Sequence, residues 1–123
     1  MILIGDEFIT HEDIVKINNI ESIKNTKPTS TLMFDYNMDL IKYCHKNSLN
    51  FAVVIGDIKE LIYSSQFDTK YIICNKTLCI EAQKIAENYM FDSKILVIID
   101  SDNEITWVAQ NEIDGVIYKK VLL

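Results

Sequence analysis

Polar and charged residues follow each apolar run that the sequence predicts to be a strand. The carboxyl ends of parallel strands meet at one edge of a sheet, where loops and helix N-termini also converge, so we expect these side chains to gather there. Several carboxylates in one place could bind Mg²⁺ through oxygen ligands or serve acid–base catalysis. The candidate ligand-binding residues are Asp35, Tyr36, Asp57, Asn75, Asp100, Ser101 and Lys119.

The same residues have a second, purely structural interpretation. Asp, Asn and Ser are the residue types preferred at helix N-caps and in turns, so capping alone explains the composition of this edge. Lys119 would supply the cation for an anionic ligand, with Asp35, Asp57 and Asp100 as the acids. Both interpretations stay open at this point.

Other chemical motifs have little support in the sequence. Gly56, which precedes Asp57, is an isolated glycine and belongs to no G-x-G-x-x-G or Walker pattern, so no nucleotide cofactor is predicted. His11 and His45 share no metal-ligand spacing, and we expect both on the surface, with no metal site. The three cysteines lack a C-x-x-C pair, and we expect buried free thiols at Cys44, Cys74 and Cys79.

The central element predicted to position the edge residues is residues 94–100, Lys-Ile-Leu-Val-Ile-Ile-Asp. This run is apolar on both alternating faces, which is typical of a buried strand in a parallel sheet. We therefore expect helices on both faces of the sheet.

Strand-like and helix-like segments alternate from residue 31 onward. Their spacing of about 19 to 24 residues per unit allows only short helices, and strands alternating with helices predict a parallel sheet with right-handed crossovers. Predicted strands cover residues 31–35, 51–55, 70–74, 94–100 and 116–118, and predicted helical segments lie around residues 38–46, 58–62, 77–89 and 105–109. Thr77 is the expected cap of the third helix, and Ser101 or Asp102 that of the fourth.

The first thirty residues are less regular. Residues 1–4 predict an edge strand and residues 8–10 a second short strand, separated by the turn Gly5-Asp6-Glu7. Residues 13–17 fit an edge strand or a helix start, residues 20–25 one or two helical turns, and residues 26–30 a loop around Pro28.

These patterns predict one α/β domain over residues 1–123. It consists of an N-terminal extension with an edge strand, residues 1–30, and βα repeats, residues 31–123. The expected architecture is an open, mostly parallel, doubly wound sheet of the flavodoxin or Rossmann kind, with about five βα units.

The order of elements from Thr31 onward resembles a response-regulator receiver domain. Residues 109–119 resemble that family's last helix-to-strand passage and also the βα units of barrel enzymes. The resemblance implies a flavodoxin-like topology. It does not extend to the family's phosphorylation site, since Asn75 stands where a phosphorylatable aspartate is required. Asp35-Tyr36, Asp100-Ser101 and Lys119 or Lys120 occupy the other matching places.

Composition limits the classes of partner. A net charge of −6 and a pI near 4.8 give no general attraction for nucleic acid or an anionic membrane. The first residues lack the basic region of a secretory signal, and no apolar run in the sequence is long enough to span a bilayer. We therefore expect a cytoplasmic protein.

Two functional hypotheses follow. The first is a non-catalytic domain that acts by protein contact, as a homo-oligomer or with a protein partner, through Trp107 and the apolar end Val121, Leu122 and Leu123. This hypothesis expects the last strand to lie at a sheet edge and to continue into exposed leucines. The second is a small-molecule or Mg²⁺-dependent binding or enzymatic site at the carboxyl edge.

Overall fold

The apolar runs form the strands of one parallel sheet in the computed structural model, which describes residues 1–123. The strands are β1 (Ile2–Ile4), β2 (Ile14–Lys16), β3 (Thr31–Asp35), β4 (Phe51–Val54), β5 (Tyr71–Cys74), β6 (Lys94–Ile99) and β7 (Gly115–Tyr118). The helices are α1 (Ile20–Ile23), α2 (Met38–Lys46), α3 (Ile58–Ser64), α4 (Lys76–Asn88), α5 (Ile105–Gln110) and α6 (Lys119–Leu122), with a 3₁₀ turn η1 (Asp102–Glu104) before α5.

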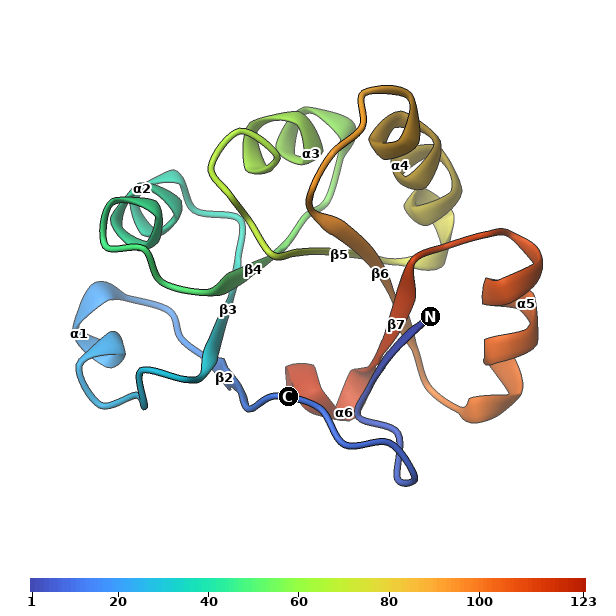
Figure 1. Cartoon of the computed structure of the whole chain (residues 1–123), viewed down its shortest axis with the longest axis horizontal. Coiled ribbons are helices and arrows are strands. Elements are labelled where there is room, and N and C mark those ends of the chain that lie inside the picture. Colours follow the sequence, from blue (N-terminus) through green and yellow to red (C-terminus); the bar gives the residue numbers. More distant parts are fainter.

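The sheet has the order β1-β7-β6-β5-β4-β3-β2, and every neighbouring pair is parallel. From β2 to β7 the strands lie in chain order, whereas β1 pairs with the last strand. Figure 1 shows that the sheet curls, with the helices α1 to α5 around its convex side. The result is an incomplete ring of strands whose gap lies between β1 and β2.

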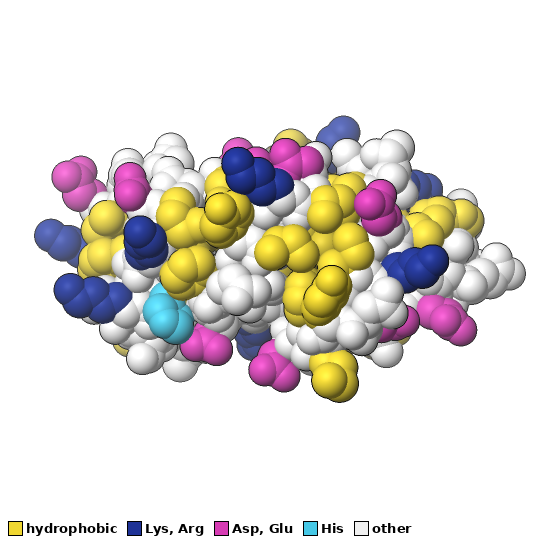
Figure 2. Space-filling view, turned by 90° about the horizontal axis from the view of Figure 1, so that it is seen from above, with side chains coloured by type: hydrophobic (Ala, Val, Ile, Leu, Met, Phe, Trp, Pro, Cys, Tyr) yellow, Lys and Arg dark blue, Asp and Glu magenta, His cyan; other side chains and the backbone are white.

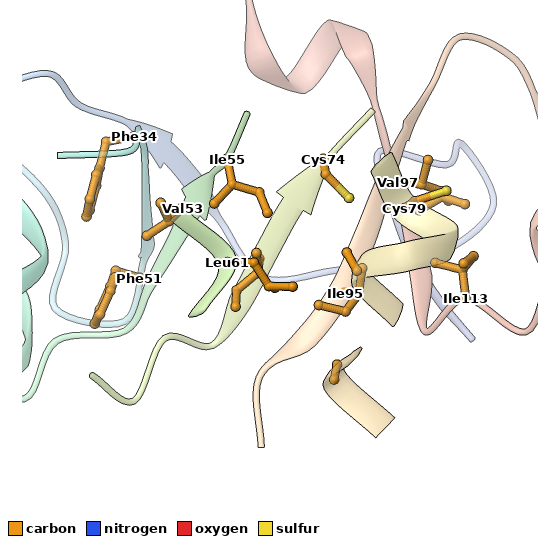
Figure 3. Close-up of a cluster of buried hydrophobic side chains, with 14 of the residues drawn as sticks. Phe34, Phe51, Val53, Ile55, Leu61, Cys74, Cys79, Ile95, Val97 and Ile113 are labelled. Atoms are coloured by element: carbon orange, nitrogen blue, oxygen red, sulfur yellow. The ribbon is translucent and has the colours of Figure 1, made fainter. Parts of the chain in front are cut away.

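The larger part of the core lies between the convex face and the helices. The rings of Phe34 and Phe51 stack there with centroids 5.9 Å apart, and Leu61 of α3 lies next to Ile55 (Figure 3). Ile95, Val97 and Ile99 of β6 face the same layer. Helices α2 and α4 present their apolar stripes to it, with Leu40, Ile41 and Cys44 buried on α2 and Cys79, Ala82 and Ala86 buried on α4.

A second, smaller core fills the concave face. It consists of inward side chains from six strands, with Val121 and Leu122 of α6 packed against it. Lys16 Nζ of β2 donates to the carbonyl of Leu122 at 2.9 Å, so α6 is tied to the strand on the far side of the gap. The buried members of this concave cluster are Ile4, Met33, Ala52, Tyr71, Ile73, Leu96 and Ile117.

The predicted α/β class with an open parallel sheet is confirmed, and both faces of β6 are buried as expected. The sheet has seven strands: the five of the predicted βα units, β1 as the predicted edge strand, and β2, because residues 14–16 form a strand and not the start of a helix. Helices cover the two faces unequally: five lie on the convex side, and α6 alone lies in the concavity. The strands β3 to β7 keep their chain order, where flavodoxin-like sheets have the order 2-1-3-4-5.

Two predictions about strands are wrong. Residues 8–10 form no strand and belong to the connection between β1 and β2. The last strand is not at a sheet edge, because β1 pairs with it on one side and β6 on the other. The residues after it turn into α6 and do not extend the strand.

Three helices end in the same way. The residue after each C-cap adopts a left-handed backbone conformation, and the next N–H donates to the carbonyl five residues earlier, a Schellman arrangement. The left-handed residues are Ser48 (φ 54°), Met90 (φ 53°) and Glu112 (φ 58°), and the bonds join Leu49 to Cys44, Phe91 to Ala86 and Ile113 to Val108. None of the three is glycine, so each of these helix ends carries some backbone strain.

The β1–β7 pair depends on a glycine. A Cβ atom at Gly115 would lie 2.5 Å from the carbonyl oxygen of Ile2 and 2.9 Å from Leu96 Cδ2. Both neighbours are fixed, one by the backbone and the other by the concave cluster. The close approach of these strands therefore requires a residue without a side chain.

We predict that Gly115→Ala lowers the free energy of unfolding by about 1 to 3 kcal/mol, because the added methyl group displaces β1. Urea denaturation measures the change. Gly56→Ala is the matched control, since its Cβ would meet nothing closer than Glu60 Oε1 at 3.7 Å. Equal effects of the two substitutions would contradict the prediction.

Candidate functional site

All seven candidate ligand-binding residues lie along the carboxyl rim of the sheet. Asp35 ends β3 and Tyr36 follows it, and Lys119 follows β7. Asp57, Asn75 and the pair Asp100-Ser101 stand between β4, β5 and β6 and the helical segments that follow these strands. The rim expected from the sequence is therefore present, and the question is which of its side chains meet.

Asp57 and Asn75 are helix caps. Asp57 Oδ1 accepts a hydrogen bond from the Glu60 N–H at 2.8 Å, and Glu60 Oε1 accepts one from the Gly56 N–H at 2.8 Å. Asn75 Oδ1 accepts from the Leu78 N–H at 3.1 Å and caps α4. The predicted cap, Thr77, is wrong: it lies inside the helix, and its hydroxyl donates to Asn75 Oδ1 at 2.6 Å.

Asp100 and Ser101 are held through a residue that we did not predict, Glu104. Its Oε2 accepts hydrogen bonds from the N–H groups of Asp100 at 2.6 Å and Ser101 at 3.0 Å, and Ser101 caps η1. Its Oε1 forms an ion pair with Lys76 at the start of α4. The Lys76 contact and these backbone N–H groups lower the pKa of Glu104 to about 2, although partial burial acts in the opposite direction.

Tyr36 lies close to the cap of α3. Burial raises its pKa, and the nearby groups Glu60, Tyr63 and Asp57 raise it further. Asp35 and Tyr36 also line a small hollow of about 180 Å³ with Lys16 of β2. Asp35, Tyr36 and Asp57 therefore lie near one another at one end of the rim.

The rim does not form one metal site. No group of three or more His, Cys, Asp or Glu side chains is placed to hold a metal ion, so Asp35, Asp57 and Asp100 do not converge on one. Lys119 is exposed on α6, and no ion pair or side-chain hydrogen bond joins it to these acids. The predicted set is therefore divided into separate local groups.

A cavity of about 230 Å³ lies where β1, β6 and β7 end. Tyr118 is buried beside it and donates its hydroxyl hydrogen to Asp6 Oδ2 at 3.0 Å. Burial and the carboxylates of Asp6, Asp102 and Glu7 raise the pKa of Tyr118 to about 12, so the hydroxyl keeps its proton at neutral pH. The lining residues are Gly5, Asp6, Glu7, Ser101, Asp102, Tyr118 and Lys120.

The candidate interface residues differ in exposure. Trp107 is half-buried against the convex core, with Lys76 Nζ 5.4 Å from its ring centroid, so it is not an exposed tryptophan. Val121 and Leu122 are half-buried against the concave cluster, and Leu123 is 89% exposed. Only Leu123 therefore has the free apolar surface that the sequence suggested for this end.

The opposite, amino rim carries a cluster that the sequence analysis missed. The Glu12 carboxylate accepts hydrogen bonds from Tyr71 Oη at 2.8 Å and Thr31 Oγ1 at 3.0 Å and forms an ion pair with Lys70. Burial alone would raise the pKa of Glu12. The hydrogen bonds from Lys70, Tyr71 and Thr31, together with the positive charge of Lys70, outweigh burial and lower the pKa. Glu12 thereby connects the start of β2 to β3 and β5 across the concavity.

Beside this cluster lies the largest cavity, about 460 Å³. Two lysines and two aspartates line it, so its charged side chains sum to zero. Lys70 and Asp68 are paired within the chain, with Glu12 and His45 respectively, whereas Asp92 and Lys94 form no ion pair within the chain. The lining residues are Ile2, Asn50, Asp68, Thr69, Lys70, Tyr71, Asp92 and Lys94.

The cysteines are free and buried, as predicted. Burial raises the pKa of Cys44 to about 11 and that of Cys74 to about 12, and it raises the pKa of Cys79 as well. Since the thiolate is the nucleophilic form, these thiols are packing residues of the convex core.

Glu104 and Glu60 were within reach of sequence reasoning. Each stands three residues after a cap residue, Ser101 and Asp57, which is the spacing of a capping box. The Glu12 cluster was not, because its members come from distant parts of the sequence and no local pattern joins them.

The comparisons with known proteins assign no family. No protein-family model matches the chain, and no curated protein is similar to it in sequence. No helix combines the length and the apolar character needed to cross a bilayer.

We predict that Glu104→Gln lowers the free energy of unfolding at neutral pH by about 1 to 2 kcal/mol, because it removes charged hydrogen bonds to two backbone N–H groups and to Lys76. The native pKa lies below the ordinary value of 4.5, so the stabilisation is complete above that pH and is lost as the pH falls toward about 2. Urea denaturation as a function of pH measures both effects.

Glu112→Gln is the control, since Glu112 is exposed and its carboxylate accepts no backbone hydrogen bond. If Glu104→Gln left the acid dependence of stability unchanged, the assigned network would be wrong.

Proposed function

We propose that this protein acts by binding another protein chain and has no catalytic activity. The observation that carries the proposal is the apolar surface on the outer side of the convex helices. Ile62 and Tyr63 of α3 are 38% and 46% exposed, and Ile80 of α4 is 48% exposed. Large apolar side chains grouped on a surface are typical of protein-binding sites.

Figure 2 looks onto these helices and shows hydrophobic side chains gathered in two areas, with lysine and acidic side chains around them. An apolar centre with a charged rim is the usual organisation of a protein interface. The helices α2 to α4 form the outermost layer of the molecule, so nothing else in the chain covers this face.

The use of the polar rim residues also supports a binding role. Asp57 Oδ1, Asn75 Oδ1 and Glu104 Oε2 all accept hydrogen bonds from backbone N–H groups at helix starts. A carboxylate engaged in this way is a poor general base, since proton transfer would compete with helix capping.

The proposal includes a cytoplasmic location and self-association as one form of protein contact. Three free thiols and no disulfide fit a reducing compartment.

Self-association needs a surface that two copies can share without charge repulsion, in a protein whose net charge is −6.

We predict that the double variant Ile62→Glu/Ile80→Glu loses a binding partner that the unmodified protein retains, because two carboxylates would be buried at the interface. Affinity capture from cell extract, quantified by mass spectrometry for both forms, measures the loss. Both positions are exposed, so the free energy of unfolding should change by less than about 0.5 kcal/mol each.

Ile9→Glu is the matched control, because Ile9 is 47% exposed but lies in the connection between β1 and β2, away from the convex helices. A capture profile identical for the double variant and the unmodified protein would reject the convex face as the binding surface.

A second candidate is a small-molecule site at the carboxyl rim, favoured by the cavity between the ends of β1, β6 and β7. Asp6, Glu7 and Asp102 line it with Lys120, and the pattern suits a small ligand that carries an amine and an acid group. Binding of small amino acids, followed by calorimetry and compared with Asp102→Asn, tests this candidate. It fails if no such ligand binds.

A further inference from the structure

The end of α4 exposes two large side chains near the largest cavity. Met90 lines a small hollow of about 130 Å³ together with Lys94, and Lys94 also lines the largest cavity. Tyr89 is 72% exposed and Met90 85% exposed, and the Tyr89 ring stacks on Phe91 with centroids 6.4 Å apart. Tyrosine and methionine are both enriched in protein interfaces. We call Tyr89 and Met90 the apolar knob.

Met90 is unusual in its backbone as well as in its exposure. Among the four non-glycine residues with positive φ it is the only apolar one, the others being Ser48, Asp68 and Glu112. Glycine or asparagine at this place would end the helix with less strain. The stability of a single chain therefore gives no reason for a solvent-exposed methionine here.

The knob and the amino-rim cavity belong to one continuous surface. Asp92 and Lys94, which line the cavity, follow Met90 by two and four residues, so about 7 to 13 Å of chain separates them at most. A two-fold axis passing between the knob and the cavity would place the knob of each copy over the cavity of the other. Such an arrangement is an isologous interface, which uses the same patch on both subunits.

The charges of this surface suit a second copy. Asp68, Lys70, Asp92 and Lys94 sum to zero, and Glu12, the ion-pair partner of Lys70, adds one negative charge beside them, whereas the whole chain carries −6. Asp92 and Lys94 lack partners within the chain, and the two-fold relation would bring Asp92 of one copy near Lys94 of the other. The carboxyl rim is more acidic and would repel its own copy, because Lys119 and Lys120 there face a larger number of acids: Asp6, Glu7, Asp35, Asp57, Asp100 and Asp102.

The cavity is an open hollow of about 460 Å³, a volume large enough for a methionine or tyrosine side chain. Six of its eight lining residues are polar or charged, so the thioether or phenol of the knob would contact them at its edges. Tyr71 and Ile2 provide the apolar part of its wall.

We propose that two copies of this chain associate through their amino rims, with the Tyr89–Met90 knob of each copy seated in the cavity of the other. The inference rests on the proposed function, that the protein works by protein contact, and names a second copy as one partner. It uses a surface separate from the convex face of α3 and α4.

The first test compares Met90→Gly with the unmodified full chain by sedimentation velocity over a wide range of protein concentrations. Glycine keeps the left-handed helix end and removes the Met90 side chain from the knob, so the monomer should be at least as stable, while dimerisation weakens by about tenfold or more. Glu112→Gly relieves the same strain after α5 and should leave dimerisation unchanged.

The second test reverses charges across the two-fold axis. Lys94→Asp should weaken dimerisation, because it places two acidic groups of each copy against those of the other, and the double variant Asp92→Lys/Lys94→Asp should restore it. Both side chains are exposed, so the fold tolerates the changes.

A monomer at all concentrations, or a dimer insensitive to Met90→Gly and Lys94→Asp, would overturn this inference. Either result leaves the proposed function to its own test, since the Ile62→Glu/Ile80→Glu capture experiment does not depend on the amino rim. Conversely, a loss of captured partners with intact dimers would separate the two surfaces.

Discussion

Burial of the concave face is the constraint on which the rest of the structure depends. Every strand carries apolar side chains on both sides, and α1 to α5 cover only the convex side. The sheet curls until inward residues such as Met33, Ile73 and Ile117 pack against one another, and α6 adds Val121 and Leu122. A flat sheet of the same strands would leave these residues in water, at roughly 25 cal/mol for each Å² of apolar surface.

The curl of the sheet also determines what the polar residues at its two rims do. At the carboxyl rim, helices start in close succession, and their first N–H groups require acceptors. Asp57 and Asn75 supply them for α3 and α4, and Glu104 accepts hydrogen bonds from the N–H groups of Asp100 and Ser101 just before η1. These contacts rigidify the rim and divide its polar residues into local groups. At the amino rim the helices end, so fewer side chains are needed there for capping. The Glu12 cluster closes part of that opening, and a cavity remains beside it.

Local patterns in the sequence predicted the parts of this structure that depend on local physics. The run before Ser101 indicated a strand buried on both faces, and the spacing of Met38, Ile41 and Cys44 gave α2. The position of β1 beside β7 could not be predicted, since that pairing joins residues more than a hundred positions apart. For the same reason the last strand was wrongly expected at an edge, and the meeting of Glu12 with Lys70 and Tyr71 was missed. The sequence placed the rim residues at the correct edge of the sheet. It did not show which of them contact one another, because those contacts depend on how each helix starts. Only the capping-box spacing of Glu60 and Glu104 gave information about the helix starts.

The pairing of the first strand with the last has a consequence for biosynthesis. Strands β2 to β6 can assemble in the order in which the ribosome delivers them, each against the one before. Ile2–Ile4 has no partner strand until Gly115–Tyr118 has been made more than a hundred residues later, so this apolar segment stays unpaired while β2 to β6 are synthesised. Of all the strand pairings in this sheet, β1 with β7 joins the residues that are farthest apart in sequence, so its loop is the most costly in entropy to close.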